Sequence, residues 1–338
     1  MENFKAMENM KRLETLCIAG AVAVLAVSCG KEEAVREDGA SKVGFTAAEL
    51  QVKTVFGEKA DGEYPVLWTS NEKVALFYNS QTGDQTGGGQ YADVLPSADW
   101  HTAGFSASFT DDGNGSHSFY AMSPLSALNW MGNEDWDGNG VNEKILYANI
   151  PHDQIPVPGT CDEKAQIVFA KEEFSEFPDK VDLTFSHMTA YGLITSLSLP
   201  EEATEIVGVL IESNRILSGE IYYNYNSLDN TIKHSIFLGE YNKDGKVIKE
   251  PNAFKYIYLD VNNGGLKAKT LENVFFACTP QTDGKDVFGE GDYLKFKVHT
   301  DDSKTWVKTV NFSADRTLAF KAGRISSFSV SAHGFEKQ

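Results

Sequence analysis

One short stretch of the chain carries oxygen donors at alternate positions, which is the spacing of a calcium-binding loop. Asp135, Asp137 and Asn139 are separated by single residues, and the neighbouring glycines permit a sharp turn. The match covers only the first half of such a loop, because Leu146 stands where its bidentate glutamate would be. The sequence leaves two interpretations open, a Ca²⁺ site and a solvated turn, and it indicates no other cofactor.

Other arrangements that carry chemistry are missing from the sequence. Seven histidines are scattered without a pair at the spacing of helical metal ligands. There is no nucleophile elbow, HExxH, phosphate-binding loop or Cys-x-x-Cys motif. Adjacent carboxylates such as Asp111 and Asp112 lie among turn residues, where nothing marks them as the acid and base of a hydrolase. We therefore expect no enzymatic activity.

The N-terminal residues have the order of a secretory leader. Lys11 and Arg12 precede an uncharged apolar run that ends in small residues before Cys29. The run is too short to span a bilayer and resembles a bacterial lipobox, which implies removal of residues 1–28 and acylation of Cys29. The Lys-Glu-Glu that follows resembles the signal that sends lipoproteins of Bacteroides-like bacteria to the outer face of the outer membrane. An ordinary signal peptide with an incidental cysteine is the alternative.

Composition limits the partners of the secreted chain. Its formal net charge is −18, which argues against electrostatic binding to nucleic acid or anionic lipid, so the acyl chain would supply the membrane contact. Apart from Cys17 and Cys29, only Cys161 and Cys278 remain. Two isolated cysteines do not make a disulfide framework. We expect two packed free thiols, although a disulfide between them stays open.

The rest of the chain is predicted to be all-β. Residues 29–42 are charged and poor in apolar side chains, as in a flexible tether. Beyond them, short runs of period two separated by Gly, Asn and Asp turns predict half-buried antiparallel strands packed as sandwiches. About 310 residues remain after the leader, which is more than one core usually organises. We place a boundary near Phe174–Lys180 and predict domains at 43–179 and 180–334. The clearest alternating residues are Phe105, Ala107 and Phe109; Val181, Leu183 and Phe185; Leu294, Phe296 and Val298; and Phe328, Val330 and Ala332.

Several stretches, in order along the chain, together resemble the fimbrillin family, the lipoprotein pilins of Bacteroides-like bacteria. They include a tryptophan followed by a turn and an apolar strand, an aromatic strand that ends in proline, a Pro-x-x-Gln step, a Phe-x-His strand and a glycine turn into the last strand. The corresponding residues are Trp68–Phe77, Ser118–Pro124, Pro151–Gln154, Phe185–Ala190 and Leu318–Phe328.

The resemblance implies two tandem transthyretin-like antiparallel β-sandwich domains and assembly of a fimbrium for adhesion. In that scheme, cleavage after a basic residue clears an N-terminal segment, and the vacated groove accepts a β-strand donated by another fimbrillin subunit. Arg36 is the first candidate for cleavage and Lys42 the second. The short end after Val330 keeps a tip, accessory or anchor subunit as an alternative to a stalk pilin.

Exposed aromatic side chains support a second interpretation, a monomeric surface lipoprotein that binds glycans. Sugars stack on aromatic rings, although aromatic residues are also common in strands for packing reasons. The candidates are Trp100, Trp130, Trp136, Tyr222, Tyr223 and Tyr225.

Overall fold

The computed structural model describes residues 40–47, 55–56, 66–68, 73–79, 89–98, 102–113, 115–134, 143–226, 231–236, 240–241, 247–249, 253–280 and 287–338. These residues form strands and two short 3₁₀ turns, η1 (Leu125–Ala127) and η2 (Glu163–Ala165), with no α-helix among them. The all-β prediction is confirmed. Within the same ranges, no helix has the length and apolar character needed to cross a bilayer.

Two sheets enclose the first core. Sheet N1 has the strand order β13-β1-β7-β6, and sheet N2 has the order β14-β12-β8-β4-β5. Apolar side chains from both sheets, among them Phe45, Phe105 and Phe119, are almost fully buried between them. The strands of N1 are β1 (Ala40–Ala47), β6 (Leu95–Pro96), β7 (Ala103–Thr110) and β13 (Lys180–Leu183); those of N2 are β4 (Lys73–Tyr78), β5 (Gln90–Asp93), β8 (His117–Ser123), β12 (Val168–Phe174) and β14 (Phe185–His187).

A third sheet covers the other face of N2. Sheet M has the order β18-β17-β10-β9, with β21 paired to β17, and its inner side chains pack on Phe77 and Met122. Strands β4 and β8 are therefore buried on both faces, which is why their sequences are nearly continuous apolar runs. The strands of M are β9 (Leu128–Glu134), β10 (Glu143–Ile150), β17 (Ser218–Asn226), β18 (Thr231–Ile236) and β21 (Ala253–Phe254).

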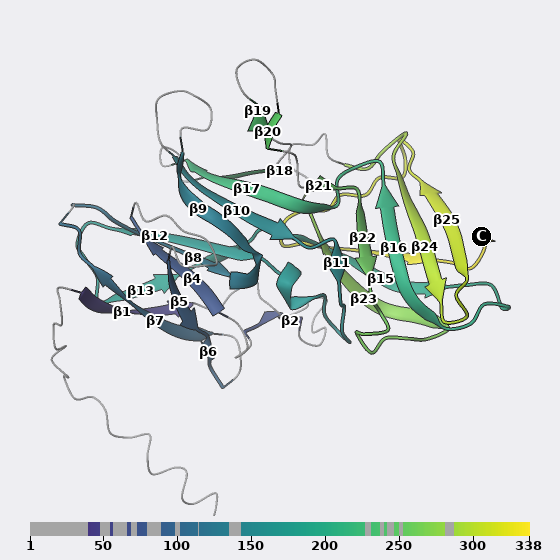
Figure 1. Cartoon of the computed structure of the whole chain (residues 1–338), viewed down its shortest axis with the longest axis horizontal. Helices are drawn as coiled ribbons and strands as arrows, with labels where there is room; N and C mark the ends of the chain where they lie inside the picture. Colours follow the sequence, from purple (N-terminus) through teal and green to yellow (C-terminus); the bar gives the residue numbers. More distant parts are fainter. Residues whose placement is uncertain are drawn as a thin grey trace, which may run out of the picture. The chain divides into compact units, whose positions relative to one another are not determined.

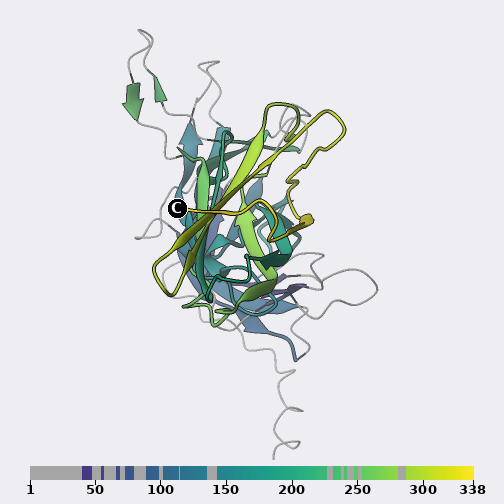
Figure 2. The same cartoon turned by 90° about the vertical axis from the view of Figure 1, so that its right-hand side faces the viewer.

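The second core lies between sheet C1, with the order β11-β22-β16-β24-β25-β27, and the three-stranded sheet C2, with the order β23-β15-β26. The C-terminus lies beside β25, as Figures 1 and 2 show. The strands of C1 are β11 (Asp153–Gln154), β16 (Ile206–Ser213), β22 (Tyr256–Leu259), β24 (Tyr293–Thr300), β25 (Thr305–Asn311) and β27 (Glu336–Lys337); those of C2 are β15 (Ala190–Ser198), β23 (Thr270–Cys278) and β26 (Ile325–Val330). Two further pairs are β2 (Val55–Phe56) with β3 (Val66–Leu67), and β19 (Glu240–Tyr241) with β20 (Val247–Lys249).

The alternating runs form strands, but not all of them are antiparallel. Burial alternates along β7 and β24, as their sequences predict, and both strands have antiparallel neighbours. By contrast, β13 pairs with β1 in parallel and β26 pairs with β15 in parallel, so the antiparallel prediction is wrong for these two. Alternation reports that one face is buried, and it carries no information on the direction of the neighbouring strand.

Strand pairing crosses the domain boundary predicted at 179/180. Strands β13 and β14 lie after that boundary, yet they pair with β1 and β12 of the first core. In the other direction, β17 pairs with β10 in sheet M. The sheets therefore do not divide at Phe174–Lys180, because this charged, proline-containing stretch is the turn between β12 and β13.

Candidate functional site

Strand β1 is the first strand of the described chain and lies in the interior of sheet N1. It pairs with β7 on one side and with β13 on the other, as Figure 1 shows. Val43, Phe45 and Ala47 point into the core and are at most 2% exposed, whereas Gly44 and Thr46 lie on the opposite, half-buried face. The alternation of β1 thus fits one buried face and two occupied edges.

Phe45 is the side chain that ties β1 to both sheets of the first core. Its ring stacks on Phe105 at a centroid distance of 5.7 Å, and it meets Phe109 and Phe119 edge-on at 6.1 and 5.7 Å. If β1 left, these rings would face an open groove with the unpaired backbone edges of β7 and β13 on its two sides. Such a groove is chemically suited to one ligand, another extended strand with alternate apolar side chains.

The predicted maturation residues fall on either side of the start of β1. Lys42 lies within β1, opposite Ser108 of β7. Cys29 and Arg36 lie outside the described residues. A cut after Arg36 would leave β1 attached to the chain that follows it, whereas a cut after Lys42 requires the first residues of β1 to leave β7, because the pairing with β13 begins only at Gly44.

A polar cluster lies at the turn between β7 and β8, directly after the β7 residue that pairs with the start of β1. The ligand atoms of Asp111, Asp112 and His117 lie within 4.8 Å of one another. The phenol of Tyr78 donates to Asp112 Oδ1 at 3.0 Å and lies 2.7 Å from His117 Nδ1, and Asn79 Nδ2 donates to Asp112 Oδ2 at 2.6 Å. Burial raises the pKa of Tyr78 to about 12, so the phenol stays a hydrogen-bond donor at neutral pH.

Among the described residues, this cluster is the group whose side chains could hold a cation. The sequence shows Asp111 and Asp112 as an adjacent pair but not their partners, because Tyr78 is distant in the sequence and belongs to another strand. The predicted calcium ligands Asp135, Asp137 and Asn139 lie outside the described residues. Their Ca²⁺ site stays a prediction.

The aromatic residues proposed as a sugar platform are only partly described. Trp130 is half-buried and lies on the Tyr147 ring at a centroid distance of 5.7 Å, so one of its faces is used in packing. Trp100 and Trp136 lie outside the described residues, and Tyr222, Tyr223 and Tyr225 belong to β17. These positions bring together no described pair of exposed rings.

The remaining sequence candidates are buried within the fold. Cys161 and Cys278 are free and fully buried, as expected for packed thiols, and burial raises the pKa of both. These groups offer no reactive surface.

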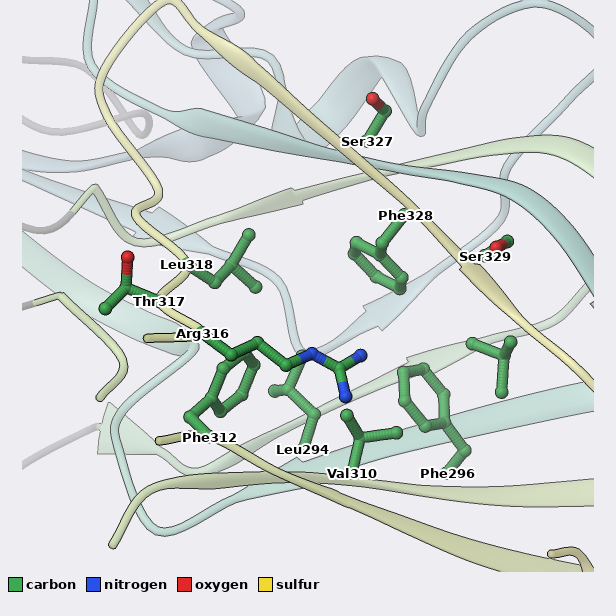
Figure 3. A pocket seen from close by; sticks show the side chains of 11 residues that line it. Leu294, Phe296, Val310, Phe312, Arg316, Thr317, Leu318, Ser327, Phe328 and Ser329 are labelled. Atoms are coloured by element: carbon green, nitrogen blue, oxygen red, sulfur yellow. The ribbon is translucent and has the colours of Figure 1, made fainter. Parts of the chain in front are cut away.

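A cavity of about 160 Å³ opens beside β26 in the second core. Leu294, Phe296 and Val310 of sheet C1 form one wall and Phe328 of β26 another, and the Arg316 side chain extends across the space between them (Figure 3). Sequence analysis missed this site, because its residues come from strands and a loop that only the fold brings together. An aliphatic or aromatic side chain with a nearby anion would suit such a lining.

No family model and no curated protein matches the chain. Its structure is similar to that of a candidate cell adhesion protein from Bacteroides ovatus, with 11% identity, a TM-score of 0.45, and coverage of 88% of this chain and 95% of that one. A fimbrial assembly protein from Parabacteroides distasonis has 11% identity and a TM-score of 0.37 over 88% and 94% of the two chains. Because these TM-scores lie below 0.5, we draw no functional argument from the likeness.

Proposed function

We propose that this protein is a cell-surface fimbrial subunit, or an accessory, tip or anchor subunit, that assembles by strand exchange and serves adhesion. The observation that supports this is the position of β1, a strand near the start of the folded chain that fills an interior place in sheet N1. A strand near a chain end can leave and be replaced without unthreading the rest of the molecule. We also propose that the protein is not an enzyme.

The proposed exchange uses the groove beneath β1. The backbone edges of β7 and β13 would each hydrogen-bond to an incoming strand, and the aromatic rings around Phe45 would take its alternate side chains. Leaving the groove empty would expose this aromatic core to water. Exchange with the strand of another subunit therefore costs far less than simple loss of β1.

Proteolytic cleavage during maturation would determine when β1 can leave sheet N1. A cut after Arg36 would free one end of β1 from the anchored tether, whereas complete removal of β1 needs a cut on its other side, where Lys53 is the first basic residue. Arg36 stays the first candidate for the cleavage that releases the subunit from its anchor and Lys42 the second, and we propose Lys53 in addition as the position whose cleavage would release β1. Acylation of Cys29 would hold the uncut precursor on the outer membrane.

A disulfide that joins β1 to β7 and can be reduced again, here called the β1 lock, tests the proposal. Gly44 and Ser106 are opposite each other in β1 and β7, on the face away from the core. Gly44→Cys with Ser106→Cys places a disulfide across this pair. Polymers are detected as a ladder of bands that withstands denaturing electrophoresis of protein sheared from cells. We expect this ladder in the wild type. The oxidised double-cysteine variant should lose it and regain it under reduction.

The control is a second cross-strand disulfide, Lys295→Cys with Thr309→Cys, which joins β24 to β25 and leaves β1 free. Arg36→Ala and Lys53→Ala, each compared with the wild type, test the two cleavage positions. A ladder that persists with β1 locked would refute exchange at this strand. Monomer in every sample, the wild type included, would refute the fimbrial function altogether.

A further inference from the structure

The two edge strands of sheet C2, β23 and β26, differ in what pairs with their outer backbone groups. At the β23 edge, the side-chain amide of Gln154 accepts from Ala277 N at 2.9 Å and donates to Ala277 O at 2.7 Å, so the chain covers this edge itself. At the other edge, β26 pairs with β15 alone, and no strand among the described residues joins its outer side. A free strand edge is a place where another extended segment can add.

The space beside β26 has the form of a short groove. Sheet C1 extends beyond β26, so Phe296 of β24 and Val310 of β25 form an apolar floor that sheet C2 does not fully cover. Ser327 and Ser329 are exposed along the edge, and Phe328 between them lines the cavity (Figure 3). An added strand could therefore bond to the β26 backbone while one of its side chains enters the cavity.

Two cations flank this groove without a carboxylate. Arg316 lines the cavity, and none of the ion pairs among the described residues includes it. Lys308 lies two positions from Val310 on β25 and donates to the Ser331 carbonyl at 2.8 Å, again with no described acid. Burial first and the charge of Arg316 second lower the pKa of Lys308, so the two cations are close enough to repel. This arrangement is unusual in a chain with 48 acidic and 30 basic residues.

We propose that this groove binds the segment Glu33–Glu37 of a second copy of the chain, which adds as a strand to β26. In an extended segment, Glu33, Val35 and Glu37 point to one side at intervals of about 7 Å. Val35 fits the apolar cavity. The carboxylates of Glu33 and Glu37 supply the acidic partners that Arg316 and Lys308 do not have among the described residues. The inference rests on the proposed function in requiring neighbouring copies on one surface, and the copy that supplies the segment is uncut at Arg36, because a cut there would separate Val35 from Glu37.

A synthetic peptide of residues 30–39, with a fluorophore at its C-terminus, tests the recognition by titration against the full chain. We expect Arg316→Glu to weaken binding at least tenfold and the peptide variant Glu37→Lys to restore part of that loss. Lys269→Glu, at an exposed position that does not line the cavity, is the charge-matched control and should leave binding unchanged. The peptide variant Val35→Asp should not bind the unaltered protein, which keeps the test independent of protein folding.

Cross-linking identifies the copy that supplies the segment. One protein carries Ser329→Cys and another carries Ala34→Cys, and the two are mixed under mild oxidation. A disulfide between the two chains supports the proposal. A third protein carries both substitutions, and if it forms mainly an intramolecular disulfide, the proposal is overturned. Equal binding of an unrelated acidic peptide, or no peptide binding, also overturns it. Because the β1 lock leaves this groove intact, peptide binding to the locked protein separates this proposal from the ladder test.

Discussion

Gln154 and Ala277 form a pair of hydrogen bonds that imitates a strand ladder. The Gln154 side chain accepts from the Ala277 N–H at 2.9 Å and donates to the Ala277 carbonyl at 2.7 Å, and Gln154 is 1% exposed. A side chain from the segment between β10 and η2 thus replaces the neighbour that β23 does not have. Because both backbone groups are buried, their pairing matters more than that of an exposed amide.

Gln154→Ala should lower the free energy of unfolding by about 1–3 kcal/mol, because it leaves two buried backbone groups without a partner. The matched control is Gln90→Ala at an exposed position of β5, which should stay within about 0.5 kcal/mol of the wild type. Urea unfolding followed by tryptophan fluorescence gives both values. Equal stability of the two variants would show that the Gln154 amide does not secure this edge.

Phe45→Ala should be among the most damaging substitutions in the first core. Removing a ring that contacts Phe105, Phe109 and Phe119 leaves a cavity, with an expected loss of about 3–5 kcal/mol. Ser106→Ala, at an exposed position of the neighbouring strand, is the control. The shift in the urea midpoint measures both. If Phe45→Ala lowered the free energy of unfolding no more than the surface control Ser106→Ala, β1 would not be held in this groove.

Gly323→Ala and Gly334→Ala should differ although both glycines have positive φ, 69° and 84°. A Cβ at position 323 would lie 2.8 Å from His187 Cδ2, whereas at 334 the nearest atom is Lys308 Cε at 4.0 Å. Both variants carry the left-handed backbone cost of about 1–2 kcal/mol, and only the first adds a collision. We expect a lower melting temperature for Gly323→Ala; the reverse order would contradict this account of the turn before β26.

Tyr78 should make stability fall at alkaline pH. Burial raises its pKa from 10.0 to about 12, so the folded protein resists losing the phenolic proton that the unfolded chain gives up. The contribution of this protonated phenol to the free energy of unfolding is complete below pH 10 and is lost as the pH rises toward 12. In Tyr78→Phe, the loss of unfolding free energy between pH 9 and pH 11 should be smaller than in the wild type. Tyr293→Phe, on the half-buried edge of β24, is the control, and identical pH profiles for wild type and Tyr78→Phe would disprove the assignment.

The sequence predicts the character of single strands well and their partners poorly. Alternation at Phe105–Phe109 and Leu294–Val298 predicts one buried face, and β7 and β24 have it. The same kind of alternation at Val181–Leu183 gave the wrong direction of pairing, because direction depends on the neighbour. The stretch Phe174–Lys180 looked like a domain boundary because a charged turn with proline is common to linkers and hairpins alike.

The candidate sites were harder to foresee than the strands. Each depends on residues that meet only through long-range pairing, such as Tyr78 with His117 or Arg316 with Phe328. No local pattern in the sequence marks Arg316, whose environment is set by two sheets and a loop. The sequence likewise does not mark β1 as an exchangeable strand: it predicts residues 40–42 as part of the tether, whereas the structure places them in β1, and the partners of β1 are set by long-range pairing.

In the proposed exchange, the two-sided pairing of β1 would also set how an assembled fibre responds to mechanical load. A donated strand in this groove would be hydrogen-bonded to β7 along its whole length by bonds perpendicular to the strand, and to β13 over its second half by slanted bonds. A pull along the fibre would then load these bonds in shear, all at once, instead of opening them one after another from an end. Subunits joined in this way would resist flow forces that easily peel apart an edge contact.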